Sequence, residues 1–453
     1  MRMALPRSRC LATAFIFVLF APIDAGAVDL PSDVTLAGSI RLRYETLANQ
    51  AREGLSANDD LLSIRTRLFA EYHPGPMRFG AELYDSRAYL GDAAGAIDAN
   101  EVNALELAQA YVGYSFGMQS GEGAPYNVEF GRFVMDIGSR RLVGANQYRN
   151  TVNSFTGVRA DLPLVGGASA TLLYVLPHIR LPIDKQSLLD NAIAFDRESF
   201  DLVLWGGYVT APHAIGDAAL DFTFFHLGER DSPHLPTRNR SLDTLGSRII
   251  RDPRPGSFDY EAEGFYQFGS IRDGFTQNAV KQDVSAGAVH LDAGYTAHDP
   301  WQPRLSIEAN YVSGDGRGNS YNRFDTLFGT RRTDFGPSGI YSAIARTNIV
   351  SPGLKIEANP DVYLDWFVSY RLLWVASPTD AFSGTGVSDP ADKSGRFAGQ
   401  QLEGRMRYWI IPDALQFEAD AAFLLKGHFL ITAPNAPATG DTRYVSLNLT
   451  AYF

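Results

Sequence analysis

The sequence is almost without cysteine: among 453 residues only Cys10 is present, and it precedes the first apolar run, residues 11–20. Arginines lie ahead of this run and Ala25-Gly26-Ala27 follows it, which is typical of a secretory signal peptide and its cleavage site. The run is too short to span a bilayer as a helix. We therefore expect residues 1–27 to be removed. Residues 28–453 should form one domain without disulfide bonds or thiol chemistry.

A basic surplus is also lacking. The chain has 51 acidic and 40 basic residues, a formal charge of −11 at pH 7 that becomes −13 without residues 1–27, which hold three Arg and one Asp. A nucleic-acid partner needs a basic surface, so the composition excludes that class. Lysine is scarce, at five residues against 35 arginines. This favours the planar, two-pronged binding of carboxylates, although GC-rich codon usage would produce the same bias.

Long hydrophobic runs are missing after the signal peptide, so the sequence predicts no membrane-spanning helix, which needs roughly 20 apolar residues. Yet 45% of the residues are hydrophobic, and they alternate with polar ones; Leu42, for example, lies between Arg41 and Arg43. This period of two is typical of half-buried β-strands. It predicts eighteen strands, of which 240–250 has the least clear apolar face: 34–47, 61–73, 77–87, 105–116, 126–135, 153–162, 168–178, 200–211, 218–228, 240–250, 257–269, 282–297, 303–313, 347–358, 361–375, 398–411, 413–426 and 442–453.

The connections between these strands alternate between short and long. Short ones, such as 74–76 and 163–167, are rich in Pro and Gly, whereas long ones, such as 88–104 and 314–346, are polar. Short turns on one side and long loops on the other are typical of an outer-membrane barrel. The last strand alternates and ends at Phe453, as in barrels that are presented to the barrel-assembly machinery.

We therefore predict an all-β fold. It is a transmembrane, antiparallel up-and-down β-barrel of about 18 strands, with short periplasmic turns and long extracellular loops. Such a chain is an integral protein of the outer membrane of a Gram-negative bacterium, surrounded by outer-membrane lipid. Eighteen strands enclose a lumen wide enough to hold water.

Alternation also predicts which charges face the lumen. If the apolar side chains face lipid, the basic residues that point inward are Arg41, Arg43, Arg65, Arg67, Arg78, Arg159, Arg405 and Arg407. Acidic residues that point inward gather across the ring, at Asp259, Glu261, Glu263 and Glu308. We expect an Arg-rich wall that faces an acidic one and attracts a carboxylated solute. The alternative is that these charges simply pair with one another.

The stretch from Gly131 to Asp161 joins two predicted strands by a long polar loop that carries Arg140, Arg141 and Arg149. A loop so rich in arginine is costly unless it meets water or an anion. The alternation of loop lengths places it on the extracellular side. The three arginines are therefore candidates for the outer vestibule or for an infolded loop.

Several stretches resemble the bacterial alginate-export family of outer-membrane proteins. They are RTRLFAEYHPGPMRFGAELYDSR at 65–87, DIGSRRLVG and FTGVR within 131–159, and YVSGDGRGNSYNRFDTLFGTRR with its continuation within 311–354. The resemblance covers nearly the whole chain after the signal peptide. It implies an eighteen-stranded barrel with a narrow, electropositive, Arg-lined conduit for a uronate polysaccharide, partly closed by long loops.

The resemblance also implies pore-lining residues. The arginines that match the family's positions near its constriction are Arg132, Arg159, Arg323, Arg332, Arg405 and Arg407. Arg87 belongs to the Asp-Ser-Arg piece of the family pattern and joins these candidates. By strict alternation Arg132 shares the lipid-facing side with Phe130. Its place in the pore therefore requires a β-bulge at Gly131.

No motif for chemistry accompanies this pattern. The eight histidines show no metal-binding spacing, and there is no phosphate-binding or dinucleotide-binding motif, so we predict no catalytic residue, metal or cofactor. The favoured function is an outer-membrane channel that passes an anionic, alginate-like polysaccharide. One alternative is a porin for small anionic solutes. Another, with less support, is an outer-membrane enzyme or adhesin built on the same barrel.

Overall fold

The computed structural model describes residues 31–117, 125–232, 236–332 and 334–453. The predicted signal peptide, residues 1–27, lies outside the described residues. In the part of the chain that is described, no helix is long and apolar enough to cross a membrane.

Eighteen strands make up nearly all of the regular structure, and each corresponds to one predicted strand, the uncertain 240–250 included. Two short helices, α1 (Lys185–Leu189) and α2 (His428–Thr432), lie in long loops, and a 3-10 turn, η1 (Val165–Gly167), lies in a short one. The strands are β1 (Val34–Ala48), β2 (Asn58–Tyr72), β3 (Met77–Tyr89), β4 (Asn103–Phe116), β5 (Tyr126–Phe133), β6 (Phe155–Pro163), β7 (Ser169–Pro177), β8 (Leu202–Ile215), β9 (Ala218–Glu229), β10 (Ser241–Arg251), β11 (Ser257–Arg272), β12 (Lys281–Thr296), β13 (Arg304–Val312), β14 (Ile349–Ala358), β15 (Leu364–Trp374), β16 (Phe397–Ile411), β17 (Leu415–Lys426) and β18 (Thr442–Tyr452).

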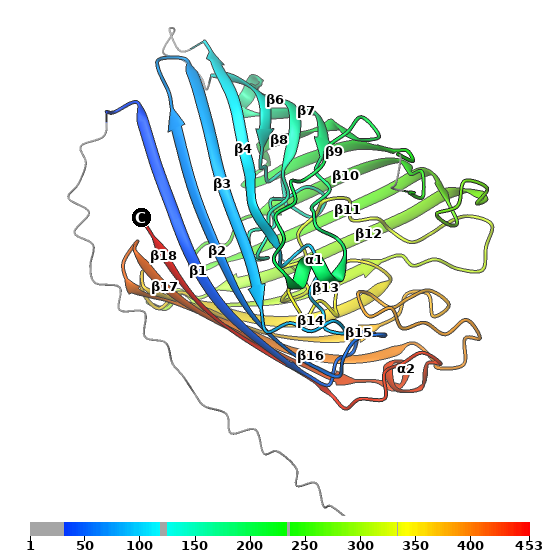
Figure 1. Cartoon of the computed structure of the whole chain (residues 1–453). Coiled ribbons are helices and arrows are strands. Elements are labelled where there is room, and N and C mark those ends of the chain that lie inside the picture. Colours follow the sequence, from blue (N-terminus) through cyan, green and yellow to red (C-terminus); the bar gives the residue numbers. More distant parts are fainter. Residues whose placement is uncertain (1–30, 118–124, 233–235, 333) are drawn as a thin grey trace, which may run out of the picture.

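These strands form a closed antiparallel ring, which confirms the predicted barrel (Figure 1). Each strand pairs with its neighbours in the sequence, and β1 closes the ring against β18 with Arg41 opposite Thr450. Phe453 continues this seam, because its backbone exchanges hydrogen bonds of 2.7 and 3.1 Å with Gly38. A closed ring has no free edge, so the backbone groups of the strands can pair within the sheet, as hydrocarbon surroundings demand.

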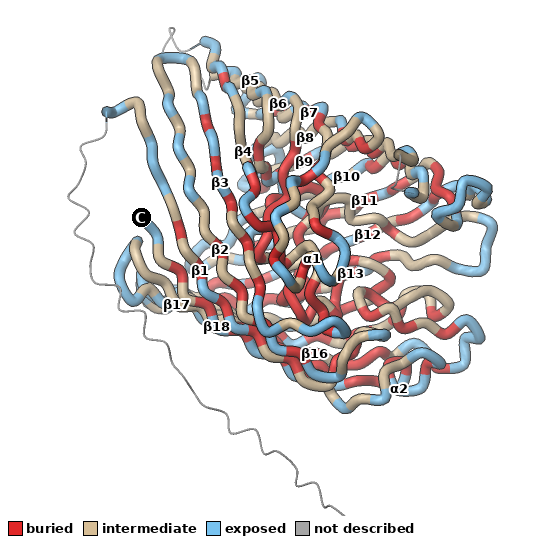
Figure 2. Tube along the Cα trace, in the orientation of Figure 1, coloured by how far each residue is buried: buried red, intermediate tan, exposed pale blue. Residues whose placement is uncertain are grey.

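Side chains alternate between the outer surface and the interior. On β1, Arg41 and Arg43 are 5% and 1% exposed, whereas Leu42 and Tyr44 are 41% and 39% exposed. Buried positions gather in the half of the barrel that carries the long loops (Figure 2). The apolar period of two is therefore set by one lipid-compatible face on each strand.

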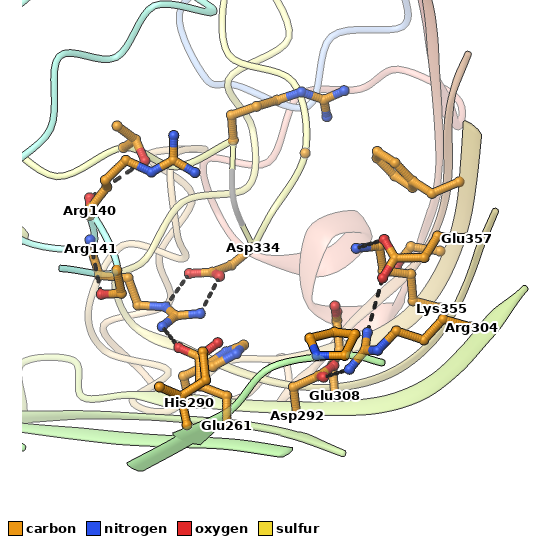
Figure 3. Close-up of a pocket in the computed structure, with 18 of the residues that line it drawn as sticks. Arg140, Arg141, Glu261, His290, Asp292, Arg304, Glu308, Asp334, Lys355 and Glu357 are labelled. Carbon is orange, nitrogen blue, oxygen red and sulfur yellow. Dashed lines mark hydrogen bonds and ion pairs between the residues drawn. The ribbon is translucent and has the colours of Figure 1, made fainter. Parts of the chain in front are cut away.

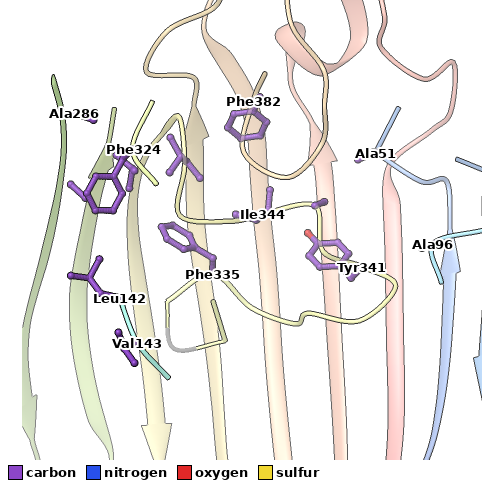
Figure 4. Packing of buried hydrophobic residues seen from close by; sticks show 14 of the residues in the cluster. Ala51, Ala96, Leu142, Val143, Ala286, Phe324, Phe335, Tyr341, Ile344 and Phe382 are labelled. Atoms are coloured by element: carbon purple, nitrogen blue, oxygen red, sulfur yellow. The ribbon is translucent and has the colours of Figure 1, made fainter. Parts of the chain in front are cut away.

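The long loops fold into the barrel. Phe335, Tyr341 and Ile344 of the β13–β14 loop and Phe382 of the β15–β16 loop are fully buried, and they pack in one hydrophobic cluster with Leu142 (Figure 4). Complete burial of such a side chain stabilises the fold by about 1.5–3 kcal/mol. The lumen of the long-loop half thus contains a hydrophobic core, which strand alternation alone did not predict.

Candidate functional site

The lumen contains a cavity of about 700 Å³ on the side of the short turns, which we call the turn-side cavity. Its walls are the inward faces of β10 to β16, and parts of the β5–β6 and β13–β14 loops cover it. Ten basic side chains line it: Arg140, Arg141, Arg248, Arg251, Arg304, Arg332, Lys355, Arg371, Arg405 and Arg407. Eight acidic ones join them: Asp136, Asp259, Glu261, Asp292, Glu308, Asp334, Glu357 and Glu403. The lining therefore has a small basic surplus within an acidic protein.

Arg141 crosses from the β5–β6 loop to the acidic strand β11 (Figure 3). Its guanidinium donates to Asp334 at 2.9 and 3.0 Å and to Glu263 at 2.6 Å, and it contacts Glu261. Burial lowers the pKa of Arg141, but the charges of Asp334 and Glu261 outweigh it and hold this pKa well above its usual value. The pKa of Asp334 lies well below its usual range, because Arg141 and Arg346 outweigh the effect of burial. The predicted acidic wall is thus met by a loop arginine.

Arg304, the first residue of β13, holds a second ion-pair network on the cavity wall (Figure 3). It donates to Asp259 and to Glu357, each at 3.0 Å, and contacts Asp292. Lys355 reaches Glu357 at 2.7 Å. Arg304 was missed as a site residue, although it lies two positions before Ser306 on the inward face, so alternation could have found it.

Arg332, Arg405 and Arg407, which were predicted to line the pore, all border this cavity. Arg332 lies in the β13–β14 loop and donates to Glu403 at 2.5 Å. Arg405 and Arg407 lie on β16 and both bind Asp365, at 3.1 and 2.9 Å. The two guanidinium groups thus meet at one carboxylate, and Glu418 of β17 lies opposite Arg407 in the sheet.

Arg41 and Arg65 clamp the β5–β6 loop. Arg41 donates to the carbonyl oxygens of Tyr148 and Arg149 at 3.1 and 2.8 Å. Arg65 donates to those of Gln147 and Arg149 at 2.7 and 3.0 Å. These two predicted pore arginines therefore lie beneath an infolded loop and hold its backbone.

Tyr148 of the same loop lies between two more of the predicted arginines. The guanidinium carbons of Arg43 and Arg332 lie 4.2 and 4.8 Å from the centre of its ring. Its hydroxyl donates to Asp420 at 3.3 Å. Burial, followed by the charge of Asp420, raises the pKa of Tyr148, so this phenol stays neutral. Cation–π contacts of this kind fix the loop across the lumen, and nothing in the local sequence pattern identified Tyr148.

Two loop segments, 140–150 and 328–332, form a partition inside the barrel. They are joined by a parallel β-bridge between Val143 and Phe328 and by backbone hydrogen bonds of 2.8–3.2 Å. On its far side lies a second space of about 650 Å³, the loop-side cavity, which the residues of this partition also line. The partition therefore lies between two polar chambers of the lumen.

Among the residues that the structure describes, the loop-side cavity is lined by arginines and by one carboxylate, that of Asp325. The predicted residue Arg323 lies here and donates to Asp380 at 2.7 Å. The arginines of this cavity are Arg149, Arg180, Arg323, Arg331 and Arg346. The three loop arginines of the Gly131–Asp161 stretch are thus divided, because Arg140 and Arg141 border the turn-side cavity and Arg149 the loop-side one.

Three more predicted arginines lie inside the barrel but border neither cavity. Arg67 pairs with Glu82 at 2.6 Å and Arg159 pairs with Asp161 at 3.0 Å. Arg78 pairs with Glu129 of β5 at 3.3 Å. These arginines are each matched with a neighbouring acid on the wall.

Arg87 is placed differently from its expected position in the pore. It shares a face of β3 with Leu83 and Tyr89, which are 48% and 43% exposed. Tyr84 and Ser86, on the opposite face of the strand, are buried. Its partner is Asp85 on the same face, at 2.9 Å. Strand alternation therefore puts Arg87 on the outside of the barrel. The position in the pore that the family resemblance implied for Arg87 is wrong.

Arg132 also lies outside both cavities. It donates to Glu106 of β4 at 2.7 Å and to Glu198 of the β7–β8 loop at 3.1 Å. The pairings of β5 with β4 and β6 pass through Gly131 without a change of register, so the predicted bulge is wrong. Gly131 is nevertheless required, since its φ is +127° and a Cβ there would collide with the carbonyl oxygen of Ala110.

Comparison with known proteins gives a match of residues 32–444 to a family model described as alginate export. Among solved structures, OccK9 (OpdG) of Pseudomonas aeruginosa is 10% identical with a TM-score of 0.59, covering 93% of this chain and 98% of its own. OccAB3 of Acinetobacter baumannii is 10% identical with a TM-score of 0.57, covering 93% and 100%. OpdK of Pseudomonas aeruginosa is 12% identical with a TM-score of 0.56, covering 92% and 98%. Curated protein sequences give no match.

Proposed function

The chain belongs to the alginate-export family, an outer-membrane β-barrel of the channel type, and we propose that it passes an anionic, uronate-type polysaccharide through its lumen. The observation that carries the proposal is the turn-side cavity. Its ten basic side chains exceed its eight acidic ones, although the whole chain carries a formal charge of −11. A lumen of this kind attracts carboxylates locally while the protein as a whole stays acidic.

Three arginines are the proposed contacts for a passing carboxylate. Arg405 and Arg407 share the carboxylate of Asp365, and both border the turn-side cavity. Among the described residues Arg140 makes no ion pair, and it borders the same cavity. Arginine binds carboxylates in a bidentate manner, so a chain of uronate units can move from one such group to the next.

A porin for small anionic solutes is the second candidate. The partition favours it, because segments 140–150 and 328–332 divide the lumen into chambers of about 700 and 650 Å³. Spaces of this size suit small ligands. An outer-membrane enzyme or adhesin has less support, since the family is one of channel-type barrels.

Flux through proteoliposomes tests the proposal. Purified protein should pass short oligouronates faster than neutral glucose oligomers of the same length. The double variant Arg140→Gln/Arg407→Gln should lower oligouronate flux by about tenfold, the factor that roughly 1.4 kcal/mol of lost attraction gives. The exposed turn residue Arg254 supplies a matched control, Arg254→Gln, which should keep the wild-type rate. Equal flux of the charged and neutral oligomers would contradict the proposal.

A further inference from the structure

Unneutralised positive charge distinguishes the loop-side cavity. Among the described residues, five arginines and one aspartate line it, whereas ten basic and eight acidic side chains line the turn-side cavity. Two of the five, Arg323 and Arg346, are paired with the carboxylates of Asp380 and Asp334. The other three are Arg149, Arg180 and Arg331.

Among the described residues, these three arginines donate their hydrogen bonds to neutral oxygen atoms. Arg180 donates to the carbonyl of Ala99 at 2.9 Å and to the amide oxygens of Asn100 and Asn153 at 3.0 and 2.7 Å. Arg149 binds the same two amide oxygens, that of Asn153 at 2.7 Å. Arg331 donates to the backbone carbonyl of Ser342 at 3.1 Å. Within the described ranges, none of the three forms an ion pair with a carboxylate.

The positive charges of these three arginines repel one another, as the pKa of Arg149 shows. Burial lowers the pKa of Arg149 well below its usual value, and the nearby charges of Arg180 and Arg331 lower it further. Asp98 and Glu101 act in the opposite direction, but they do not restore it. Like charges that are buried without a direct ion pair are costly, so an anion that enters the cavity would relieve this cost.

We propose that the loop-side cavity is a binding site for a carboxylated sugar, with Arg149, Arg180 and Arg331 binding its carboxylate. Guanidinium groups suit a carboxylate because they offer parallel N–H donors. The rest of the lining includes the partly exposed ring of Tyr321 and the hydroxyl group of Thr326, which suit a sugar ring. At about 650 Å³ the cavity is large enough for a short oligosaccharide.

This site deepens the proposed function and rests on it only in naming a carboxylated sugar as the ligand. The partition separates it from the turn-side cavity, so a solute on the extracellular side meets it first. A uronate bound here would be held on one side of segments 140–150 and 328–332 until they move.

Isothermal titration calorimetry of the full-length protein in detergent micelles tests the site, with sodium D-glucuronate as the probe and D-glucose as the neutral control. Wild-type protein should bind glucuronate and not glucose. Arg331→Gln should weaken binding by about tenfold, and Arg180→Gln/Arg331→Gln should abolish it, because charge-assisted hydrogen bonds are lost. Arg331→Lys, which keeps the charge but not the fork, should lie between wild type and Arg331→Gln. The exposed loop residue Arg230 supplies the matched control Arg230→Gln, which should bind as the wild type does.

The difference in electrophoretic mobility between unheated and heated samples (heat modifiability) shows whether each variant forms a folded barrel. Loss of a repelling charge should leave the melting temperature unchanged or raise it, so weaker binding with an intact barrel supports the site. Unchanged affinity in Arg331→Gln, or equal binding of glucose and glucuronate, overturns it. Binding in micelles does not depend on conduction, so failure of this site and failure of transport in proteoliposomes are separate results.

Discussion

Replacing Arg41 and Arg65 together by Gln should release the infolded β5–β6 loop. The two guanidinium groups make four hydrogen bonds of 2.7–3.1 Å to the carbonyl oxygens of Gln147, Tyr148 and Arg149. That segment is one half of the partition between the two cavities. Loosening it should therefore open a continuous path through the lumen.

The size of the effect follows from these contacts. Hydrogen bonds to charged donors contribute roughly 1.5–3 kcal/mol each. The two arginines share the carbonyl of Arg149, and glutamine can replace part of the bonding, so we take about 2 kcal/mol for each arginine and about 4 kcal/mol for both. Since roughly 1.4 kcal/mol is a factor of ten, the population with a released loop should rise by about a thousandfold in the double variant.

Single-channel recording in planar bilayers measures this directly. The double variant should show larger or more frequent openings than the wild type, and each single variant should be intermediate. Arg78→Gln is the matched control, because Arg78 lies inside the barrel on the neighbouring strand β3 and pairs with Glu129 at 3.3 Å, away from the loop. Wild-type conductance in a correctly folded double variant would refute the idea that these arginines hold the partition.

Three further predictions concern stability. Asp334→Asn leaves Arg141 and Arg346 without the carboxylate they share, so it should lower the free energy of unfolding by about 3–5 kcal/mol, and an unchanged denaturation midpoint would contradict this. Burial, followed by the charge of Glu106, raises the pKa of Asp196 to about 7, so the β7–β8 loop should lose stability as pH rises from about 4 to 7. The Asp196→Asn variant should lack this pH dependence and should resist protease at pH 8 better than the wild type. Equal cleavage of the variant and the wild type would contradict this prediction. Phe335→Ala should cost about 3–5 kcal/mol in thermal unfolding, because it empties a fully buried site in the core of the loops, and a loss below 1 kcal/mol would show that this core does not stabilise the barrel.

The barrel could be predicted from the sequence because its main signal is local. Each strand has one face toward lipid, so residues such as Leu42 and Arg43 are sorted by their position in the alternation alone. The same rule places Arg87 outside the barrel, next to Asp85. The pore position that the family resemblance implied for Arg87 is therefore wrong, because alternation decides which side of the sheet a side chain occupies.

The arrangement within the lumen could not be predicted, because it depends on which loop meets which wall. Arg41 and Arg65 were assigned inward, but their carbonyl partners lie more than eighty residues away in the sequence. Tyr148 and the cluster around Phe335 gave no local signal either, since their burial results from loops that fold back into the ring. Periodicity describes a strand and its two faces, whereas the contents of the lumen depend on tertiary contacts.

The central claim is that the lumen favours anions although the chain is acidic. The reversal potential of the purified, reconstituted protein under a potassium chloride gradient tests this claim directly. We predict an anion-selective potential that shifts toward zero in Arg140→Gln/Arg407→Gln, since both arginines border the turn-side cavity. A cation-selective potential that these substitutions do not change would contradict the account.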